Sequence, residues 1–499
     1  MKRKIIISVE KQEKRVAVLE NGNLEQYFIE RPEHKRIVGN VYKAKVKNVV
    51  SGIQAAFLDI GLKMNGFLYV SDINKPFADY KEIIEEEAEE LEPTRFKKDI
   101  SIQDVLKSNQ DVLVQVVKGH IGTKGPRLTS NISLPGRYLV LMPYQQCFGI
   151  SKRISNPQER ERLREIIKGF RLPKEAGLIV RTLGDGASEK ELIRDYKYLI
   201  NLLKRIDYKF RKSDSPSLIY QEYDLVLRVI RDYFSQEVDE LIVDDKRELM
   251  RISHFLNYLA PQLKPKVKLH KEEISLFERF NLEEQIERIY KRRVNLKSGG
   301  YIVIEPTEAM VTIDVNTGSF VKKGNLEETV YITNKEAAHE IARQIKLRDL
   351  GGIIMLDFID MRSSHHRLKI FKEFMDALKT DRAKTKVLPI SELGVIEMTR
   401  QRVGKSLESV SFEECPWCQG KGLIKSVPTV AIGILRDLKK SIISSKSREY
   451  NISVNPKVAS YIYNQVREEL LSLENRYNIK IKIEADSNKH LEEIDISKG

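Results

Sequence analysis

The sequence predicts a multidomain protein that combines α/β and α+β folds, and three observations carry this prediction. A chain of 499 residues is longer than one hydrophobic core supports, so several domains are expected. Short strand-like runs separated by glycine-bearing turns dominate its first quarter. A strand–helix–strand pattern follows after residue 281, which indicates an α/β unit of its own.

The N-terminal quarter predicts a strand meander and then a small barrel. KIIISV, RVAVLE and LEQYFIE are strand-like within residues 4–30, and Asn21-Gly22 is a strong signal for a tight hairpin between the last two. Residues 38–128 contain about five further short strands, which fit a small barrel. The acidic segment 79–92, with eight acids and one lysine, is expected to be a helical excursion from this barrel.

The middle and the C-terminal half alternate strands and helices. Residues 136–215 carry the strand patterns RYLVLMP and GLIVRTLG and two helix patterns, and RKSDSPSL then has the composition of a linker. DLVLRVIRDYF and VDELIVDD follow as helix and strand. YIVIEP, MVTIDVNTG and GGIIMLDFID predict buried-type strands, with a long amphipathic helix over about 327–349 between the last two. Residues 423–499 predict a small mixed domain.

Charge and cysteine content restrict the partners and the compartment. The net charge of +14 favours a polyanion such as RNA or DNA, although a basic protein without such a partner is the alternative. Three cysteines are too few for a disulfide framework and indicate a reducing, cytoplasmic compartment. No apolar run is long enough to span a membrane, and the N-terminal apolar run is too short for a signal peptide.

Two aspartates at strand ends are candidate metal ligands. Asp314 ends the strand VTIDVNTG, and Asp357 lies late in the strand IIMLDFIDM. Adjacent strands joined by one helix would bring both carboxylates to one sheet edge, with Asn316 on the same side as Asp314. Two carboxylates and an amide oxygen suit Mg²⁺, which activates water for attack on a phosphodiester. The alternative is an ordinary turn, and Asp360 is a second candidate in the same stretch.

The segment CPWCQGKG predicts half of a zinc site. Its CxxC spacing followed by glycines is typical of a zinc knuckle, in which backbone amides approach the thiolates of Cys415 and Cys418. A structural zinc needs four ligands, so the simplest completion is a second chain and a homodimer. A redox CxxC or a chance pair are the alternatives. Cys147 is expected to be a buried apolar residue.

The order and spacing of several motifs resemble one family along nearly the whole chain. The motifs are RVAVLENG, AAFLDIG, GFLYVSDI, GTKGPRLTSNISLPGRYLVLMP, GLIVRT, IDVNTG, RDLGGIIMLDFIDM, EMTRQR and CPWCQGKG. They resemble the ribonuclease E/G family, in its shorter, ribonuclease G branch, because the long tail of ribonuclease E is missing. The resemblance implies a Mg²⁺-dependent endoribonuclease for single-stranded, A/U-rich RNA in rRNA processing and mRNA decay.

The resemblance also implies a domain plan. It assigns residues 1–37 with 220–280 to an RNase H-like subdomain, into which an OB-fold barrel of the S1 type (38–128) is inserted. A 5′-sensor region (129–219) and a DNase I-like catalytic domain (281–412) would follow. A zinc link (413–422) shared between two protomers, and a small C-terminal domain (423–499), would complete the chain, with pairing of dimers into tetramers as a further assembly.

Site residues are carried over from the resemblance position by position. It implies that Asp314 and Asp357 hold Mg²⁺ and that Asn316 supports the reaction. Contacts to RNA are implied for Phe57, Phe67 and Lys118, although residue type alone makes Phe57 a core candidate. Recognition of a 5′-monophosphate is implied for Arg181 and Thr182 in GLIVRT, and Arg181 is otherwise a routine surface arginine after a strand.

Three classes of function compete for these features. A hydrolytic endoribonuclease is favoured because both aspartates and the asparagine are present. A non-catalytic RNA-binding or ribosome-assembly factor would use only the barrel and the basic surface. A zinc-knuckle chaperone is disfavoured, because the CxxCxGxG motif occurs once rather than in several repeats.

Overall fold

The computed structural model divides the chain into two compact units, residues 1–410 and 411–499. The residues that it describes are 2–34, 36–73, 101–120, 124–318, 326–381, 383–401, 407, 411–413, 415–445 and 447–498. The acidic segment 79–92, expected to be an excursion from the barrel, lies outside these residues. Among the described helices, none is long and apolar enough to cross a bilayer.

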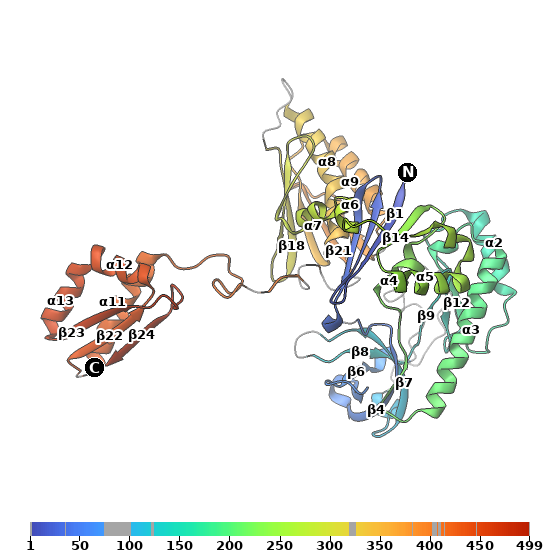
Figure 1. Ribbon diagram of the computed structural model, residues 1–499, viewed down its shortest axis with the longest axis horizontal. Helices are drawn as coiled ribbons and strands as arrows, with labels where there is room; N and C mark the ends of the chain where they lie inside the picture. Colours follow the sequence, from blue (N-terminus) through green and yellow to red (C-terminus); the bar gives the residue numbers. More distant parts are fainter. Residues whose placement is uncertain are drawn as a thin grey trace. The chain divides into compact units, whose positions relative to one another are not determined.

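The first sheet combines the N-terminus with a much later segment, in the order β15-β14-β1-β2-β3. Figure 1 shows β1 beside β14. Its strands are β1 (Arg3–Val9), β2 (Lys14–Glu20), β3 (Asn23–Glu30), β14 (Val238–Val243) and β15 (Val267–Leu269). The predicted meander is confirmed, and Asn21 and Gly22 adopt the positive φ of 52° and 85° that its tight turn requires.

Helices bury both faces of this sheet. One face packs against α4 (Leu225–Tyr233) and α5 (Lys246–Leu259), and the other against α6 (Leu276–Arg279) and α7 (Leu282–Tyr290). Strands from 1–37 and from 220–280 therefore share one core, while their likeness to RNase H stays a prediction.

A closed five-stranded barrel follows, because β4 pairs with both β5 and β7. Its strands are β4 (Val41–Val50), β5 (Ala55–Asp59), β6 (Gly66–Tyr69), β7 (Asp111–Lys118) and β8 (Arg127–Thr129), with the short α1 (Ile102–Val105) beside them. The predicted linker after residue 210 is wrong at its end, since β13 (Ser217–Tyr220) pairs with β4. Composition missed this strand because its pairing partner is distant in the sequence.

Residues 133–212 contain a small mixed sheet and two helices. The sheet has the order β11-β12-β10-β9, from β9 (Leu134–Pro135), β10 (Leu139–Met142), β11 (Phe148–Ile150) and β12 (Gly177–Val180). The helices α2 (Pro157–Lys168) and α3 (Glu189–Lys212) share its core, and Ser188 and Glu191 form a capping box at the start of α3. The strands and helices predicted here are confirmed.

The α/β unit after residue 281 is covered by helices on one face. Its sheet has the order β16-β17-β18-β19-β21-β20, and α8 and α9 lie together against it (Figure 1). The elements are β16 (Arg293–Asn295), β17 (Tyr301–Pro306), β18 (Met310–Asn316), α8 (Leu326–Leu347), β19 (Gly352–Asp357), α9 (Ser364–Leu378), β20 (Thr385–Val387) and β21 (Val395–Arg400).

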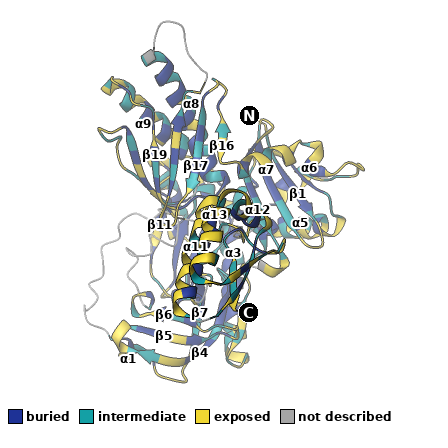
Figure 2. Cartoon of the chain, turned by 90° about the vertical axis from the view of Figure 1, so that its left-hand side faces the viewer, coloured by how far each residue is buried: buried dark blue, intermediate teal, exposed yellow. Residues whose placement is uncertain are grey.

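The strands of this unit are buried on one face only. Buried and more exposed residues alternate along β18, and Met310 and Ile353 are among the exposed apolar side chains. Buried and less buried stretches likewise follow one another in the strands around β17 and β19 (Figure 2). The expectation of fully buried strands is therefore wrong for the second face. The predicted strand–helix–strand order is confirmed, and β18 and β19 are adjacent and parallel.

The second unit, residues 411–499, has its own core. A three-stranded sheet of order β23-β22-β24 packs against three helices. The elements are α11 (Val427–Ser444), β22 (Glu449–Val454), α12 (Pro456–Gln465), α13 (Arg467–Tyr477), β23 (Lys480–Ala485) and β24 (Ile494–Lys498). The sequence predicted a small domain of mixed helices and strands in residues 423–499, and the structure has both kinds of element there.

Candidate active site and the surfaces around it

Asp314 and Asp357 are direct neighbours across two parallel strands. Their Cα atoms are register partners in the β18–β19 ladder, and both side chains lie at exposed positions. The residues before them, Ile313 and Leu356, point into the core of the unit. Because strand residues alternate between faces, both carboxylates project from the face opposite the helices.

A local concentration of negative charge surrounds this pair. Burial, followed by the charges of Asp314 and Asp360, raises the pKa of Asp357. The Nδ2 of Asn316 donates a hydrogen bond of 2.7 Å to Oδ2 of Asp314, so the amide lies beside the pair as the two-residue spacing predicted. A bound cation would relieve this repulsion.

The donor set fits a cation that keeps most of its water. The described residues contain no group of three or more His, Cys, Asp or Glu side chains placed to hold a metal ion. Mg²⁺ is commonly held by one or two carboxylates, with waters and substrate phosphate in the other positions. Asp314 and Asp357 meet that requirement.

The barrel brings aromatic and basic side chains into one cross-strand row. Phe57 is the register partner of Phe67, Phe67 pairs with Arg127, and Arg127 pairs with Lys118. Phe57 is 36% exposed, while its neighbours Ala56 and Leu58 are buried. The alternative of Phe57 as a core residue is therefore wrong, and the row lies on the outer surface.

Two members of this surface were missed by sequence reasoning. The Tyr69 ring packs edge-on against Phe67 with centroids 5.4 Å apart, and the Arg127 guanidinium lies 5.4 Å from the centroid of the Tyr69 ring. The buried Asp72 carboxylate orients Arg127 through bonds of 2.9 and 3.1 Å. A two-residue spacing from Phe67 could have indicated Tyr69, whereas no local signal marked Arg127.

Arg181 is held by protein acceptors at the end of β12. Its Nη1 donates to the Gly136 carbonyl and to Oδ1 of Asp232, each at 2.8 Å, and its side chain is only 13% exposed. The hydroxyls of Thr182 and Ser151 lie 3.0 Å apart. Arg181 is thus an oriented, partly buried cation rather than a routine surface arginine.

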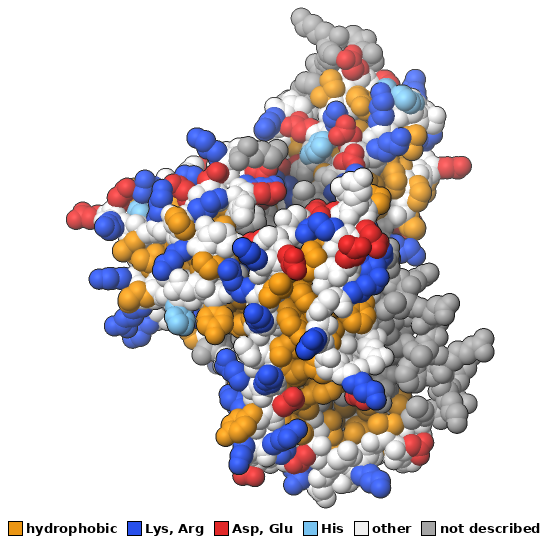
Figure 3. Space-filling model, turned by 90° about the vertical axis from the view of Figure 1, so that its right-hand side faces the viewer, with side chains coloured by type: hydrophobic (Ala, Val, Ile, Leu, Met, Phe, Trp, Pro, Cys, Tyr) orange, Lys and Arg blue, Asp and Glu red, His pale blue; other side chains and the backbone are white. Residues whose placement is uncertain are grey.

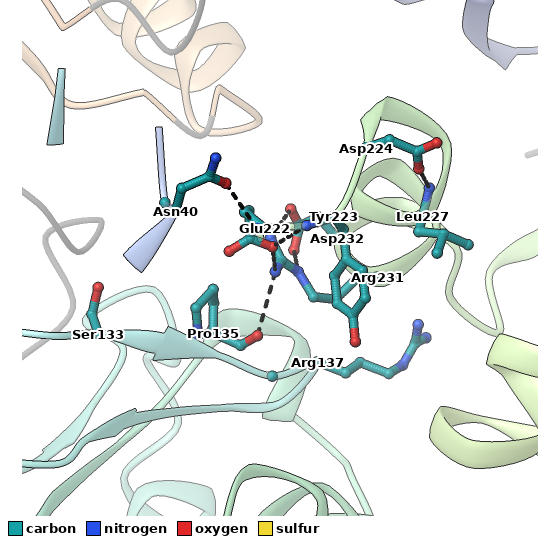
Figure 4. A network of polar contacts seen from close by, with 12 residues as sticks. Asn40, Ser133, Pro135, Arg137, Glu222, Tyr223, Asp224, Leu227, Arg231 and Asp232 are labelled. Atoms are coloured by element: carbon teal, nitrogen blue, oxygen red, sulfur yellow. Dashed lines mark hydrogen bonds and ion pairs between the residues drawn. The ribbon is translucent and has the colours of Figure 1, made fainter. Parts of the chain in front are cut away.

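Asp232 also belongs to a buried ionic network around Arg231, which Figure 4 shows together with Glu222. Burial opposes the charged form of Arg231, but the carboxylates of Asp232 and Glu222 outweigh this effect and raise the pKa of Arg231. Arg231 lies 3.0 Å from Asp232 and 2.9 Å from Glu222, and the Glu222 amide donates to Asn40 of the barrel. The network therefore connects the barrel, the sheet of residues 133–180 and α4.

A second buried carboxylate fixes the backbone beside Gly136. Asp195 on α3 accepts the amide protons of residues 137, 138 and 139 at 3.1, 2.7 and 2.9 Å. A Cβ on Gly136 would lie 2.6 Å from both oxygens of Asp195, which explains the glycine. The sequence indicated neither Asp195 nor Asp232, because the groups that each carboxylate binds lie far away along the chain.

Cys415 and Cys418 lie in a tight turn at the start of the second unit. Cys415 is exposed, and hydrogen bonds from the backbone of Cys418 and Trp417 lower the pKa of its thiol. Gln419 and Gly420 adopt positive φ of 48° and 79°, which allows the chain to fold back over the cysteines.

Cys147 is buried as predicted, and burial raises the pKa of its thiol to about 12.

Comparison with known proteins decides the family. A model described as "Ribonuclease E/G family" matches residues 133–403, and one described as "RNase E/G, Thioredoxin-like domain" matches residues 414–499. Ribonuclease G of Haemophilus influenzae is 38% identical over 493 residues, which cover 99% of this chain and 98% of that protein. The chain belongs to the ribonuclease E/G family.

Two further relatives agree with this membership. Ribonuclease G of Escherichia coli K12 is 37% identical over 496 residues, 99% of each chain. Ribonuclease E of Haemophilus influenzae is 37% identical over 96% of this chain but only 50% of its own length. Membership of this family supports an endoribonuclease that acts in RNA processing.

Proposed function

We propose that the chain is a Mg²⁺-dependent endoribonuclease that cuts single-stranded, A/U-rich RNA in rRNA processing and mRNA decay, with preference for 5′-monophosphorylated ends. The observation that carries this proposal is the register pairing of Asp314 with Asp357 on an exposed sheet face. Two carboxylates therefore lie side by side on a sheet face that no described helix covers, which supports a shared metal ion.

Each residue of the candidate active site has a proposed role. Asp314 and Asp357 would hold Mg²⁺, and Asn316 would orient the Asp314 carboxylate through its 2.7 Å hydrogen bond. When bound, the ion would supply positive charge beside the scissile phosphate and lower the pKa of a water molecule, so that the water can lose a proton and act as the nucleophile. Such attack needs no 2′-hydroxyl, so the products would carry a 5′-phosphate and a 3′-hydroxyl.

The surrounding surfaces would bind and select the RNA. Stacking of unpaired bases on Phe57 and Phe67, with Lys118 and Arg127 beside the backbone, would favour single strands. Arg181 and Thr182 would recognise the 5′-phosphate, because an oriented guanidinium matches phosphate geometry. These roles rest on the family's motifs and on the local geometry described above.

The cysteine turn would join two chains in the cytoplasm. Zn²⁺ requires four ligands, and Cys415 with Cys418 supply two, so a second copy would supply the other two. The lowered pKa of the Cys415 thiol favours the thiolate that binds zinc. A homodimer is therefore proposed, with tetramers as a further assembly.

The decisive experiment separates binding from cleavage. Asp314→Asn and Asp357→Asn should each abolish cleavage of a 5′-monophosphorylated, A/U-rich oligonucleotide in Mg²⁺ while leaving its binding nearly unchanged. Glu308→Gln is the matched control, since this exposed acid lies in the turn at the other end of β18. Asp360→Asn should keep measurable activity if the other two aspartates are the metal ligands.

Two results would overturn the proposal. Residual cleavage above one-tenth of wild type (about 1.4 kcal/mol of lost stabilisation) in either aspartate variant would remove the metal assignment. A wild-type protein that binds the RNA but never cuts it would instead be an RNA-binding or ribosome-assembly factor.

A further inference from the structure

The outer face of α3 carries a stripe of polar and basic residues along its whole length. α3 has 24 residues and is about 36 Å long. Its inner face is buried by leucines such as Leu199 and Leu203. Residues spaced alternately by four and three positions form what we name the basic stripe: Lys190, Arg194, Lys197, Asn201, Lys204, Tyr208 and Arg211. All but the half-buried Arg194 are exposed.

The positive charge of the basic stripe is not neutralised locally. No ion pair among the described residues involves its lysines or arginines, and the stripe itself contains no acid. On α2, in contrast, Arg162 pairs with Glu159 and Arg164 with Glu161. The acid nearest in sequence to Lys204 is Asp207, which accepts a 3.0 Å hydrogen bond from the Tyr144 hydroxyl.

Exposed aromatic rings accompany these cations. Tyr208 lies within the stripe and is 66% exposed. Asp207, the residue before it, accepts a hydrogen bond from the hydroxyl of Tyr144, which is 46% exposed. On the side of the molecule that carries α2 and α3, lysine and arginine side chains flank a strip of exposed apolar ones (Figure 3). Cations interleaved with exposed aromatic rings are the composition of single-strand binding surfaces.

The two ends of α3 contact the barrel and the segment of Arg181. At the C-terminal end, the Lys43 ammonium of barrel strand β4 donates to the carbonyls of Phe210 and Ser213 at 3.2 and 2.9 Å. At the N-terminal end, Glu191 accepts a hydrogen bond from Tyr138, next to the backbone that holds Arg181. The helix thus spans the distance between the barrel and the segment of Arg181.

We propose that the basic stripe, with Tyr208 and Tyr144, binds a single-stranded segment of the RNA substrate away from the point of cleavage. This inference rests on the proposed function, since it requires RNA as the substrate. Unpaired RNA is the occupant because exposed tyrosines stack on free bases, whereas a duplex offers only its phosphates and groove edges. Long substrates would gain affinity from this surface that short ones do not.

Charge removal on the stripe tests the proposal. The stripe variant combines Lys197→Gln, Lys204→Gln and Arg211→Gln, since glutamine keeps helix propensity. The control variant removes the same charges from exposed positions of the second unit: Arg436→Gln, Lys439→Gln and Lys457→Gln. The probes are 5′-monophosphorylated single strands of about 8 and about 40 nucleotides, which lie within and well above the site size of one binding barrel, about 4–16 nucleotides.

The expected result is selective for length. The stripe variant should bind the longer RNA about ten- to hundredfold more weakly, and the slope of log affinity against log salt should fall by about 2, as three lost phosphate contacts predict. Its kcat/KM for the shorter RNA, and all values for the control variant, should stay within twofold of wild type. Tyr208→Ser should weaken binding of the longer RNA about tenfold with an unchanged salt slope.

The outcomes separate this inference from the proposed function. If wild type cuts both RNAs and the stripe variant binds the longer one equally well, the inference is wrong and the proposed function stands. If wild type cuts neither RNA, the proposed function fails first. If a duplex of equal length displaces the bound RNA as well as an unlabelled single strand does, the surface recognises phosphates alone and the single-strand assignment is overturned.

Discussion

Replacing Arg181 by glutamine should erase the proposed preference for a 5′-monophosphate over a 5′-hydroxyl. The Gly136 carbonyl and Asp232 fix the guanidinium through its Nη1, so the side chain is oriented before any phosphate arrives. Loss of one charge-assisted contact of this kind costs roughly 1.5–3 kcal/mol, which corresponds to about ten- to hundredfold in the preference ratio. Because the side chain is 13% exposed, solvent screening weakens the contact less than at an open surface.

The assay compares kcat/KM for two RNAs that differ only at the 5′ end, in each protein variant. Arg181→Lys keeps the charge but loses the planar fork, so it should recover only part of the preference. Asp232→Asn removes the same ion pair while keeping the guanidinium, and it therefore isolates any effect of disturbing the network. An unchanged ratio in Arg181→Gln would refute direct phosphate recognition by Arg181, whereas an equal loss in Asp232→Asn would show that the guanidinium must be held in this orientation.

Three further outcomes are expected. Phe57→Ala combined with Phe67→Ala should weaken the binding of single-stranded RNA by about 2–6 kcal/mol, as measured by fluorescence anisotropy. Circular dichroism should show that the fold of the barrel is unchanged. Unchanged affinity would mean that this row does not bind RNA. Asp195→Ala should leave three buried amides without acceptors and destabilise the first unit by about 3 kcal/mol or more, which hydrogen exchange at those amides would report. Metal analysis with light scattering should find one zinc per two chains, and Cys415→Ser with Cys418→Ser should remove metal and dimer together, whereas one zinc per monomer would indicate a self-contained site.

Local sequence signals determined most elements and some of the site. Two-residue and 3.6-residue periodicities placed the meander, the barrel strands and the long helices, because the alternation of faces depends only on neighbouring residues. The same rule put Asn316 beside Asp314. The CxxC spacing with its glycines likewise indicated the turn that lowers the pKa of the Cys415 thiol.

Composition was misleading where burial depends on distant partners. The strand around Asp357 looks fully apolar in sequence, yet only one face of it is covered by α8 and α9. The serine- and proline-bearing segment 211–218 was expected to be a linker, but its last two residues, Ser217 and Leu218, pair with β4 of the barrel. Neither fact is encoded within the few residues over which periodicity is measured.

The tertiary structure alone decided which residues meet. The register that pairs Asp314 with Asp357 is set by hydrogen bonds between strands separated by a long helix. Four strands contribute one residue each to the row of Phe57, Phe67, Arg127 and Lys118. Secondary structure follows from interactions between near neighbours in the chain, whereas these sites arise from packing and strand register between segments far apart. One sequence therefore indicated the candidate ligands, but only the folded chain could place them side by side.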